Sequence, residues 1–206
     1  MTNIKYTIHP VFPKPIYRTF LKKKLTKKDI QYANNIRLRH KNTGNTNSRN
    51  SYILNEKRFN KLKVELESIV KNYIDNVICP KYNIKPYITQ SWLNYTSSNE
   101  YHHKHAHSNS ILSGVLYFTA DPTFDSIIFS HNKYQPILIE KKSYNLYNSE
   151  TWKFPVQSNQ VILFPSDLVH EVEMKKSNNV RISLAFNVYF KGKLGNRDSL
   201  TELILK

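Results

Sequence analysis

Histidines dominate one short stretch of the chain, and their spacing suits metal binding. His105 and His107 lie two residues apart, and in a β-strand such alternate side chains project to the same face. Two imidazoles placed in this way can bind one ion. A third suitable group comes much later, at His170 in the segment 163–172. Three imidazoles from two distant segments suit iron, zinc, copper or nickel.

A strand with a polar face follows His170. From Val180 to Phe190 every even-numbered position is apolar, whereas the odd-numbered positions are polar or small. Such alternation predicts a strand that buries one face. Arg181 and Ser183 therefore share the face opposite to the apolar one.

Together these segments resemble the Fe(II)- and 2-oxoglutarate-dependent oxygenases, in particular a phage- and bacteria-associated branch, and more weakly the prolyl hydroxylases. That branch carries His-x-His, Ser-Gly-Val-x-Tyr, Phe-Pro-Ser-x-Leu-x-His and Arg-x-Ser in this order. The matching residues here lie in 105–118, 164–172 and 181–187. The combination is specific, although no single motif is, and the resemblance extends over residues 8–190.

The resemblance implies that His105, His107 and His170 bind iron. The common facial triad has two histidines and one carboxylate, and His107 stands here at the carboxylate position. Because the matching branch also carries His-x-His, we expect a triad of three imidazoles. Asp121 and Asp125 are the nearest downstream carboxylates, and we interpret both as turn residues.

The resemblance also implies the cofactors Fe(II), 2-oxoglutarate and dioxygen, with ascorbate as an optional reductant. Arg181 is expected to anchor the distal carboxylate of 2-oxoglutarate, because a guanidinium stays charged and can pair with a carboxylate through two hydrogen bonds. Tyr117 and Ser183 match positions that help to hold this cosubstrate, and Trp92 and Asn94 are expected to line the pocket. The implied activity is hydroxylation of a substrate, coupled to decarboxylation of 2-oxoglutarate to succinate.

Each of these residues also has a purely structural interpretation. His102 and His103 precede the motif, so half of the chain's eight histidines fall within 102–107. We interpret these two as loop or pocket-rim residues, and a chance cluster on a solvated loop is the alternative for the whole group. The structural alternative for Arg181 is a surface residue of an edge strand, which the polar face shared with Ser183 makes less favoured, and the alternative for Tyr117 is an ordinary core residue.

Short strands dominate the chain after Pro86, divided by turns that contain Asn, Ser and Pro. Helices followed by strands predict an α+β fold with a double-stranded β-helix, the jelly roll of cupin-like proteins, and N-terminal helices packed on the sheet. We expect one domain over 1–206, with an extended segment and helices in 1–85, the jelly-roll core in 86–190 and a C-terminal tail in 191–206. The predicted strands are 87–96, 111–120, 126–130, 136–140, 152–156, 160–165, 170–174 and 180–190.

An extended segment and a first helix are expected before the strands. Prolines keep residues 6–17 extended, since each disfavours helix at the residue before it. Thr26 and Asp29 have the spacing of a capping box, which predicts a helix that starts there and continues to about Arg39. Residues 41–51 show no periodicity and predict a loop, which could face a substrate.

A second helix is predicted from Asn55 to Val77, because apolar residues recur there at steps of three and four. This pattern is typical of an amphipathic helix packed on a sheet, and Pro80 ends it. The single cysteine, Cys79, excludes an internal disulfide and a cysteine zinc cluster. We interpret it as a buried residue without a chemical role.

The formal net charge of +16 is typical of a chain that binds nucleic acid. Genome composition is the alternative explanation of the lysine excess, because lysine occurs here together with abundant Asn, Ile and Tyr, as in proteins encoded by an A/T-biased genome. Much of the charge lies in Lys22–Lys24, Lys27 and Lys28, where a solvated face is the usual meaning. The apolar runs are too short to span a bilayer and residues 1–5 lack a signal peptide's apolar segment. We therefore expect a cytoplasmic location, or the host cytoplasm for a viral chain.

Two other classes of protein fit part of the pattern. A cupin-type dioxygenase with three histidines and no 2-oxoglutarate explains His107 but leaves Arg181 and Tyr117 without a role. A non-enzymatic jelly-roll module with a structural metal explains the fold alone. Within the oxygenase interpretation, the resemblance favours a protein substrate such as a prolyl residue, and only the charge favours nucleic acid. Neither the substrate nor the oligomeric state follows from the sequence.

Overall fold

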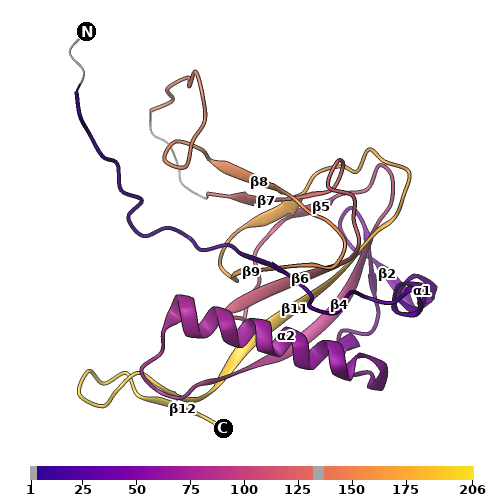
Figure 1. The fold of residues 1–206 in the computed structure, drawn as a ribbon, viewed down its shortest axis with the longest axis horizontal. Helices are drawn as coiled ribbons and strands as arrows, with labels where there is room; N and C mark the ends of the chain where they lie inside the picture. Colours follow the sequence, from indigo (N-terminus) through magenta and orange to yellow (C-terminus); the bar gives the residue numbers. More distant parts are fainter. Residues whose placement is uncertain (1–3, 132–136) are drawn as a thin grey trace.

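Two antiparallel β-sheets face each other and form the body of the protein (Figure 1). The computed structural model describes residues 4–131 and 137–206. Within these ranges the larger sheet has eight strands, in the order β1-β9-β6-β11-β4-β3-β2 with β12 paired to β11, and the smaller has the order β5-β10-β7-β8. The strands of the larger sheet are β1 (Tyr17–Phe20), β2 (Arg39–Lys41), β3 (Thr46–Ser48), β4 (Lys85–Thr96), β6 (Leu112–Thr119), β9 (Gln160–Pro165), β11 (Arg181–Leu194) and β12 (Leu203–Leu205). Those of the smaller sheet are β5 (His102–His105), β7 (Ser126–Ser130), β8 (Thr151–Pro155) and β10 (His170–Val172).

The helices lie in the N-terminal part of the chain, and the longest one covers the outer face of the larger sheet (Figure 1). The described helical segments are α1 (Lys27–Asn35), the 3-10 turns η1 (Ile53–Asn55) and η2 (Lys57–Phe59), α2 (Asn60–Tyr73) and the π-helical turn η3 (Ile74–Ile78). Antiparallel sheets with helices on one outer face confirm the predicted α+β jelly roll, although neither sheet closes into a barrel over the described residues.

The predicted capping box at the start of α1 is confirmed. The side chain of Thr26 accepts a hydrogen bond from the backbone of Asp29, and the carboxylate of Asp29 accepts one from the backbone of Thr26. The helix ends at Asn35, earlier than expected, because the following residues extend into β2. The second predicted helix is confirmed as a succession of η1, η2, α2 and η3.

Strand β11 separates two hydrophobic cores. Leu184 and Phe186 belong to the core between the larger sheet and α2, where Leu66 and Val70 of that helix also pack. A smaller core between the two sheets contains Val115, Tyr117, Ile127, Phe129, Val156, Ile162 and Phe164. The odd-numbered residues of β11 face this inter-sheet space, as the alternation of the sequence predicts.

Gly114 allows Phe186 to lie flat on β6. The two residues are partners across the β6–β11 pair, and a Cβ atom at Gly114 would lie 2.1 Å from the Cζ atom of Phe186. The aromatic ring therefore occupies the space that any other side chain at this position would need. This contact belongs to the core under α2 and not to the inter-sheet space.

Two expectations about chain segments were wrong. Residues 41–51 are not a plain loop, because β2 and β3 form a hairpin here and β3 pairs with β4. The strand predicted over 136–140 is not formed: Pro136 lies outside the described residues, and residues 137–140 are exposed and have no strand structure. The other predicted strands are confirmed, with β10 shorter and β11 longer than expected.

Cys79 is exposed, which corrects the interpretation of this residue as buried. It follows η3 with a backbone φ of 50°, and this left-handed conformation ends the helical segment before the chain continues into β4. Among the helices of the described residues, none is both long and apolar enough to cross a lipid bilayer.

Candidate functional site

Strands β5 and β10 bring two distant histidines together. His105 and His170 are direct partners across this antiparallel pair, and His107 follows β5 after one intervening residue. The ring centroids of His105 and His170 lie 4.3 Å apart, and the Nε2 atoms of His105 and His107 lie 3.2 Å apart. One ring nitrogen of each residue lies within 4.8 Å of the other two. The three predicted ligands thus converge, although His107 lies outside a strand.

Hydrogen bonds fix the tautomers of His105 and His170. Nδ1 of His105 lies 2.8 Å from the carbonyl oxygen of His103, and Nδ1 of His170 lies 3.1 Å from that of Leu168. Because a carbonyl oxygen only accepts, both Nδ1 atoms carry the proton and donate it. Each Nε2 atom then presents a lone pair, as a metal ligand must.

Two polar side chains orient His107 in the same way. Its Nδ1 lies 2.7 Å from Oδ1 of Asn187 and 2.9 Å from Oγ of Ser113. Nδ1 of His107 donates its proton to the Asn187 oxygen, so Nε2 of His107 carries a lone pair. This atom lies 3.2 Å from Nε2 of His105, which also carries a lone pair. Two lone pairs at this distance repel each other unless a cation or a proton lies between them. The arrangement therefore fits a bound cation.

Burial keeps the three imidazoles neutral. It lowers the pKa of His107 to about 4, lowers that of His170 well below its usual range and also lowers that of His105. The rings of Phe164 and Phe129 pack against His170, with centroids 4.7 and 6.2 Å from its own, and exclude water from it. Three neutral nitrogen donors suit iron, zinc, copper or nickel.

His102 and His103 lie in β5, which corrects their assignment to a loop. With His105 they form a second group of three nitrogens within 4.8 Å of one another. The ring of His102 stacks on that of His105 with centroids 4.5 Å apart, and burial lowers its pKa to about 3. Its Nε2 lies 3.2 Å from Nδ2 of Asn42, which donates to it. The group around His107 and His170 is therefore the better metal site.

No carboxylate belongs to either histidine group within the described residues. Asp121 is the turn residue that we expected, because its side chain accepts a hydrogen bond from the backbone of Thr123. Asp125 differs from the expectation: it is buried and pairs with Lys175. The triad consequently consists of imidazoles alone.

Arg181 lies on the inner face of β11 and is 2% exposed. Its Nη2 donates to Oγ1 of Thr96 on β4 at 3.0 Å, whereas its buried Nε has no partner among the described residues. Burial lowers the pKa of Arg181, and the guanidinium nevertheless stays charged. A buried cation with an unused donor fits an anionic ligand, because an uncompensated charge is costly to bury.

Next to Arg181, a row of four polar side chains crosses the inner face of the larger sheet. Successive partners across β3, β4, β11 and β6 are Asn47, Asn94, Ser183 and Tyr117. None of the four side chains takes part in a hydrogen bond with the residues that the structure describes, and the Oδ1 atoms of both asparagines are buried without a partner. Buried polar groups are normally paired, so the row is suited to hold a polar ligand.

The sequence of this central region matches a known family. Residues 90–187 match the family model described as "Putative 2OG-Fe(II) oxygenase". This part of the chain is similar to the 2OG-Fe(II) oxygenase family. The family is one of 2-oxoglutarate-dependent oxidoreductases that use Fe(II) and dioxygen. The matched region contains the three converging histidines and Arg181, and the phage-associated and prolyl-hydroxylase-like character of the branch stays a prediction.

Several solved structures share the fold of this chain at low sequence identity. An oxidoreductase of the 2OG-Fe(II) oxygenase family from Burkholderia pseudomallei is 10% identical, with 83% of each chain covered and a TM-score of 0.50. HygX from Streptomyces hygroscopicus, with nickel, 2-oxoglutarate and hygromycin B bound, is 12% identical over 85% of this chain and 82% of its own, with a TM-score of 0.58. SnoK, a non-heme alpha-ketoglutarate-dependent carbocyclase from nogalamycin biosynthesis, is 11% identical over 87% and 81%, with a TM-score of 0.60. The search of curated proteins found no match.

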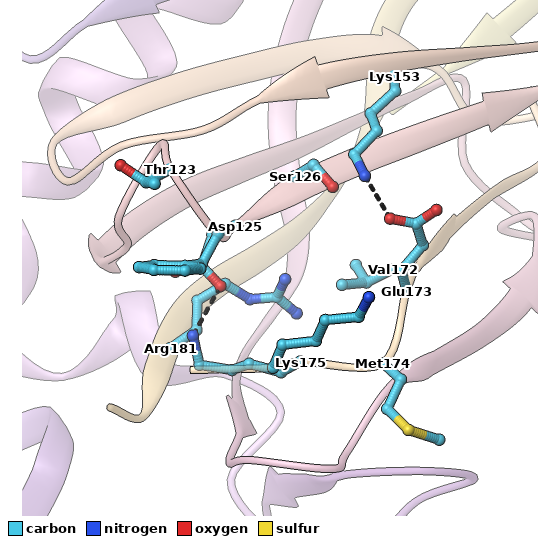
Figure 2. Close-up of a pocket in the computed structure, with 11 residues that line it drawn as sticks. Thr123, Asp125, Ser126, Lys153, Val172, Glu173, Met174, Lys175 and Arg181 are labelled. Atoms are coloured by element: carbon cyan, nitrogen blue, oxygen red, sulfur yellow. Dashed lines mark hydrogen bonds and ion pairs between the residues drawn. The ribbon is translucent and has the colours of Figure 1, made fainter. Parts of the chain in front are cut away.

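A cavity of about 180 Å³ reaches Arg181 from the side of Asp125 (Figure 2). Charged side chains surround it, including Lys153, Glu173 and Lys175. None of the three converging histidines lines this cavity. Arg181 thus borders this cavity on one side, and Ser183 of the polar row lies two residues along the same face of β11.

Sequence reasoning named most residues of this site but missed Asn187, Thr96 and Asn47. Asn187 stood in the alternating pattern of β11 with Arg181 and Ser183, so its inward direction could have been inferred. Thr96 likewise lies two residues after Asn94 in the predicted strand 87–96, so its direction could also have been inferred. Asn47 carries no such signal, because only the pairing of β3 with β4 brings it to the site. Trp92, which we expected in the pocket, lies with its ring centroid 5.7 Å from that of His107.

Proposed function

We propose that this protein is an Fe(II)- and 2-oxoglutarate-dependent dioxygenase in which His105, His107 and His170 bind the metal through Nε2. The observation that carries the proposal is the convergence of these nitrogens while hydrogen bonds hold the opposite side of each ring. When bound, the metal and 2-oxoglutarate supply dioxygen activation, with decarboxylation of 2-oxoglutarate to succinate. The protein contributes placement and exclusion of water.

The cosubstrate is proposed to lie along the inner face of the larger sheet. Arg181 offers a buried charge and an unpaired Nε to the distal carboxylate of 2-oxoglutarate. Tyr117, Ser183 and Asn94 offer polar atoms that the described residues do not use. Burial raises the pKa of Tyr117, so its hydroxyl keeps its proton and can donate. These groups orient the ligand, and none of them needs to transfer a proton.

Succinate formation tests the proposal directly. The protein incubated with Fe(II), dioxygen and 2-oxoglutarate should produce succinate, slowly without a substrate and faster with one. His105→Ala and His170→Ala should each abolish this turnover, whereas His40→Ala should keep it, because His40 is exposed on β2. Full turnover by His170→Ala would refute the assignment.

A three-histidine dioxygenase without 2-oxoglutarate is the second candidate, favoured by the absence of a carboxylate from the described triad. This candidate provides no anionic ligand to balance the buried charge of Arg181. One measurement distinguishes the two candidates. The metal-loaded protein should bind 2-oxoglutarate if the first is correct and should not bind it if the second is correct. A crystal soaked anaerobically with Fe(II) and 2-oxoglutarate would show which atoms contact it.

For the substrate we propose a protein side chain, such as a prolyl residue, on the strength of the resemblance described above. The chain 1–206 is proposed to act as a single domain. Nucleic acid is the competing substrate, supported by the charge of +16. Retention on DNA or RNA that collapses with added salt would favour nucleic acid, since phosphate contacts release counterions. Retention independent of salt, or none, would favour the protein substrate.

A further inference from the structure

An ion pair is buried beside Arg181. Nζ of Lys175 lies 2.9 Å from Oδ1 of Asp125, and each of the two side chains is 1% exposed. Asp125 precedes β7, and Lys175 lies in the segment between β10 and β11. The second carboxylate oxygen of Asp125 accepts a hydrogen bond of 2.9 Å from the backbone of Asp121. Both oxygens are therefore engaged, and neither of these bonds involves Arg181.

The guanidinium of Arg181 faces the same cavity as this ion pair (Figure 2). Arg181 and Asp125 are close enough to attract each other, and Asp125 stabilises the charged form of Arg181. A buried carboxylate and a buried guanidinium in one cavity would ordinarily form a bidentate pair. Arg181 donates to Thr96 instead, and Asp125 pairs with Lys175.

We propose that Lys175 is a positioning residue: by neutralising Asp125 it keeps Arg181 free for the distal carboxylate of 2-oxoglutarate. This inference rests on the proposed function, in which Arg181 binds that carboxylate. Three buried charges lie together here, and once Lys175 and Asp125 cancel, the charge of Arg181 remains to be balanced by the ligand. Without Lys175, Asp125 competes with 2-oxoglutarate for Arg181.

A purely structural role for the side chain of Lys175 is the alternative. The backbone around it is held independently, because the N–H of Lys175 donates to the carbonyl oxygen of Glu100, and the carbonyl oxygen of Lys175 accepts from the N–H of Asn99. Nζ of Lys175 also donates to Oγ of Ser177, which Lys175→Met loses together with the charge, but the two backbone hydrogen bonds still hold the course of the chain. What changes is the charge balance around Arg181.

The test is 2-oxoglutarate binding by the Ni(II)-loaded protein, measured by titration calorimetry. Lys175→Met keeps the length of the side chain and removes its charge, and should weaken binding on the order of tenfold, as when neighbouring groups of one network are uncoupled. The double variant Asp125→Asn/Lys175→Met also removes the competing carboxylate and should restore the affinity of the unaltered protein. Lys153→Met is the matched control: Lys153 lines the same cavity but is 54% exposed and pairs with Glu173, so affinity should stay unchanged.

The outcomes separate this proposal from the one on which it rests. Unchanged affinity in Lys175→Met, or an equal loss in the single and double variants, overturns the role of Lys175. Unchanged affinity in Arg181→Leu overturns the cosubstrate assignment itself. If Lys175→Met does not fold, Lys175→Gln takes its place, because it keeps a hydrogen-bond donor for Asp125 without the charge.

Discussion

The two faces of the β4–β11 pair differ sharply although the same two strands form both. The outer face carries Leu93, Tyr95, Leu184 and Phe186, all buried in the core under α2. The inner face carries Asn94, Thr96, Arg181, Ser183 and Asn187, which are also buried but polar. Burial is therefore similar on both faces, and only the chemistry of the side chains separates them.

The comparison shows how the free energy of burying polar groups on the inner face can be offset by the apolar core on the outer face. Unpaired polar groups on the inner face lower stability, since each gives up its bonds to water. Apolar burial on the outer face offsets this cost at about 25 cal/mol per Å². We therefore expect substitutions on the inner face to affect ligands, and substitutions on the outer face to affect folding.

The largest effect is expected at the metal ligands of the inter-sheet space. His170→Ala should remove metal binding at stoichiometric concentration and bring succinate formation to background, because two of the three imidazoles do not suffice to hold the ion. Thermal unfolding of the metal-free variant reports separately on the cavity that the buried ring leaves between Phe129 and Phe164. Metal content after desalting and succinate yield are the measurements, and retained metal would contradict the triad.

Neighbouring residues on opposite faces of β11 give the most direct contrast. Leu184→Ala should lower the free energy of unfolding by about 2–5 kcal/mol, the usual cost of emptying an apolar core site. Ser183→Ala should change it by less than about 1 kcal/mol and should weaken 2-oxoglutarate binding. Urea unfolding and calorimetric titration measure the two quantities. Equal stability losses at both positions would remove the distinction between the faces.

A smaller effect on metal affinity is expected at Asn187, the inner-face residue that accepts a hydrogen bond from His107. Asn187→Ala removes the acceptor that orients His107 and should weaken metal binding about 10- to 100-fold, as for other groups that orient a ligand. Gln90→Ala is the control, because Gln90 pairs with Asn187 across the sheet and is exposed. A competitive titration with a coloured chelator measures both affinities.

The last effect concerns pH and the metal-free protein. Burial lowers the pKa of His102 to about 3 and that of His107 to about 4 in the folded state. Below the ordinary value of about 6.5 the unfolded chain binds more protons than the folded one. The free energy of unfolding is therefore unaffected by these two histidines above about pH 6.5, and it decreases as the pH falls from about 6.5 towards 3. Urea unfolding at pH 7 and pH 5 should show the loss, and His102→Gln/His107→Gln should reduce it.

Much of this site could be predicted from the sequence because its strands alternate regularly. The even-numbered apolar positions of β11 placed Arg181 and Ser183 on the inner face, and their common direction is confirmed by the pairing with β4 and β6. The convergence of His105 with His170 needed the family resemblance, since no local pattern shows that these residues are partners across two strands.

Other parts could not be predicted, for physical reasons. The hairpin of β2 and β3 has hardly any apolar residues, and its structure comes from hydrogen bonding along the edge of β4. Residues 137–140 have a strand-like composition but are exposed, so no partner stabilises a strand there. The pairing of Asp125 with Lys175 joins residues 50 positions apart, and such pairs leave no periodic signal.

The hydrogen bonds behind the three imidazoles have a calorimetric consequence. Because His105, His107 and His170 are already neutral and already in the required tautomer at pH 7, metal uptake needs neither deprotonation nor ring rotation. After correction for the heat of the metal–buffer interaction, the heat of binding should accordingly be the same in two buffers that differ in their ionisation enthalpy.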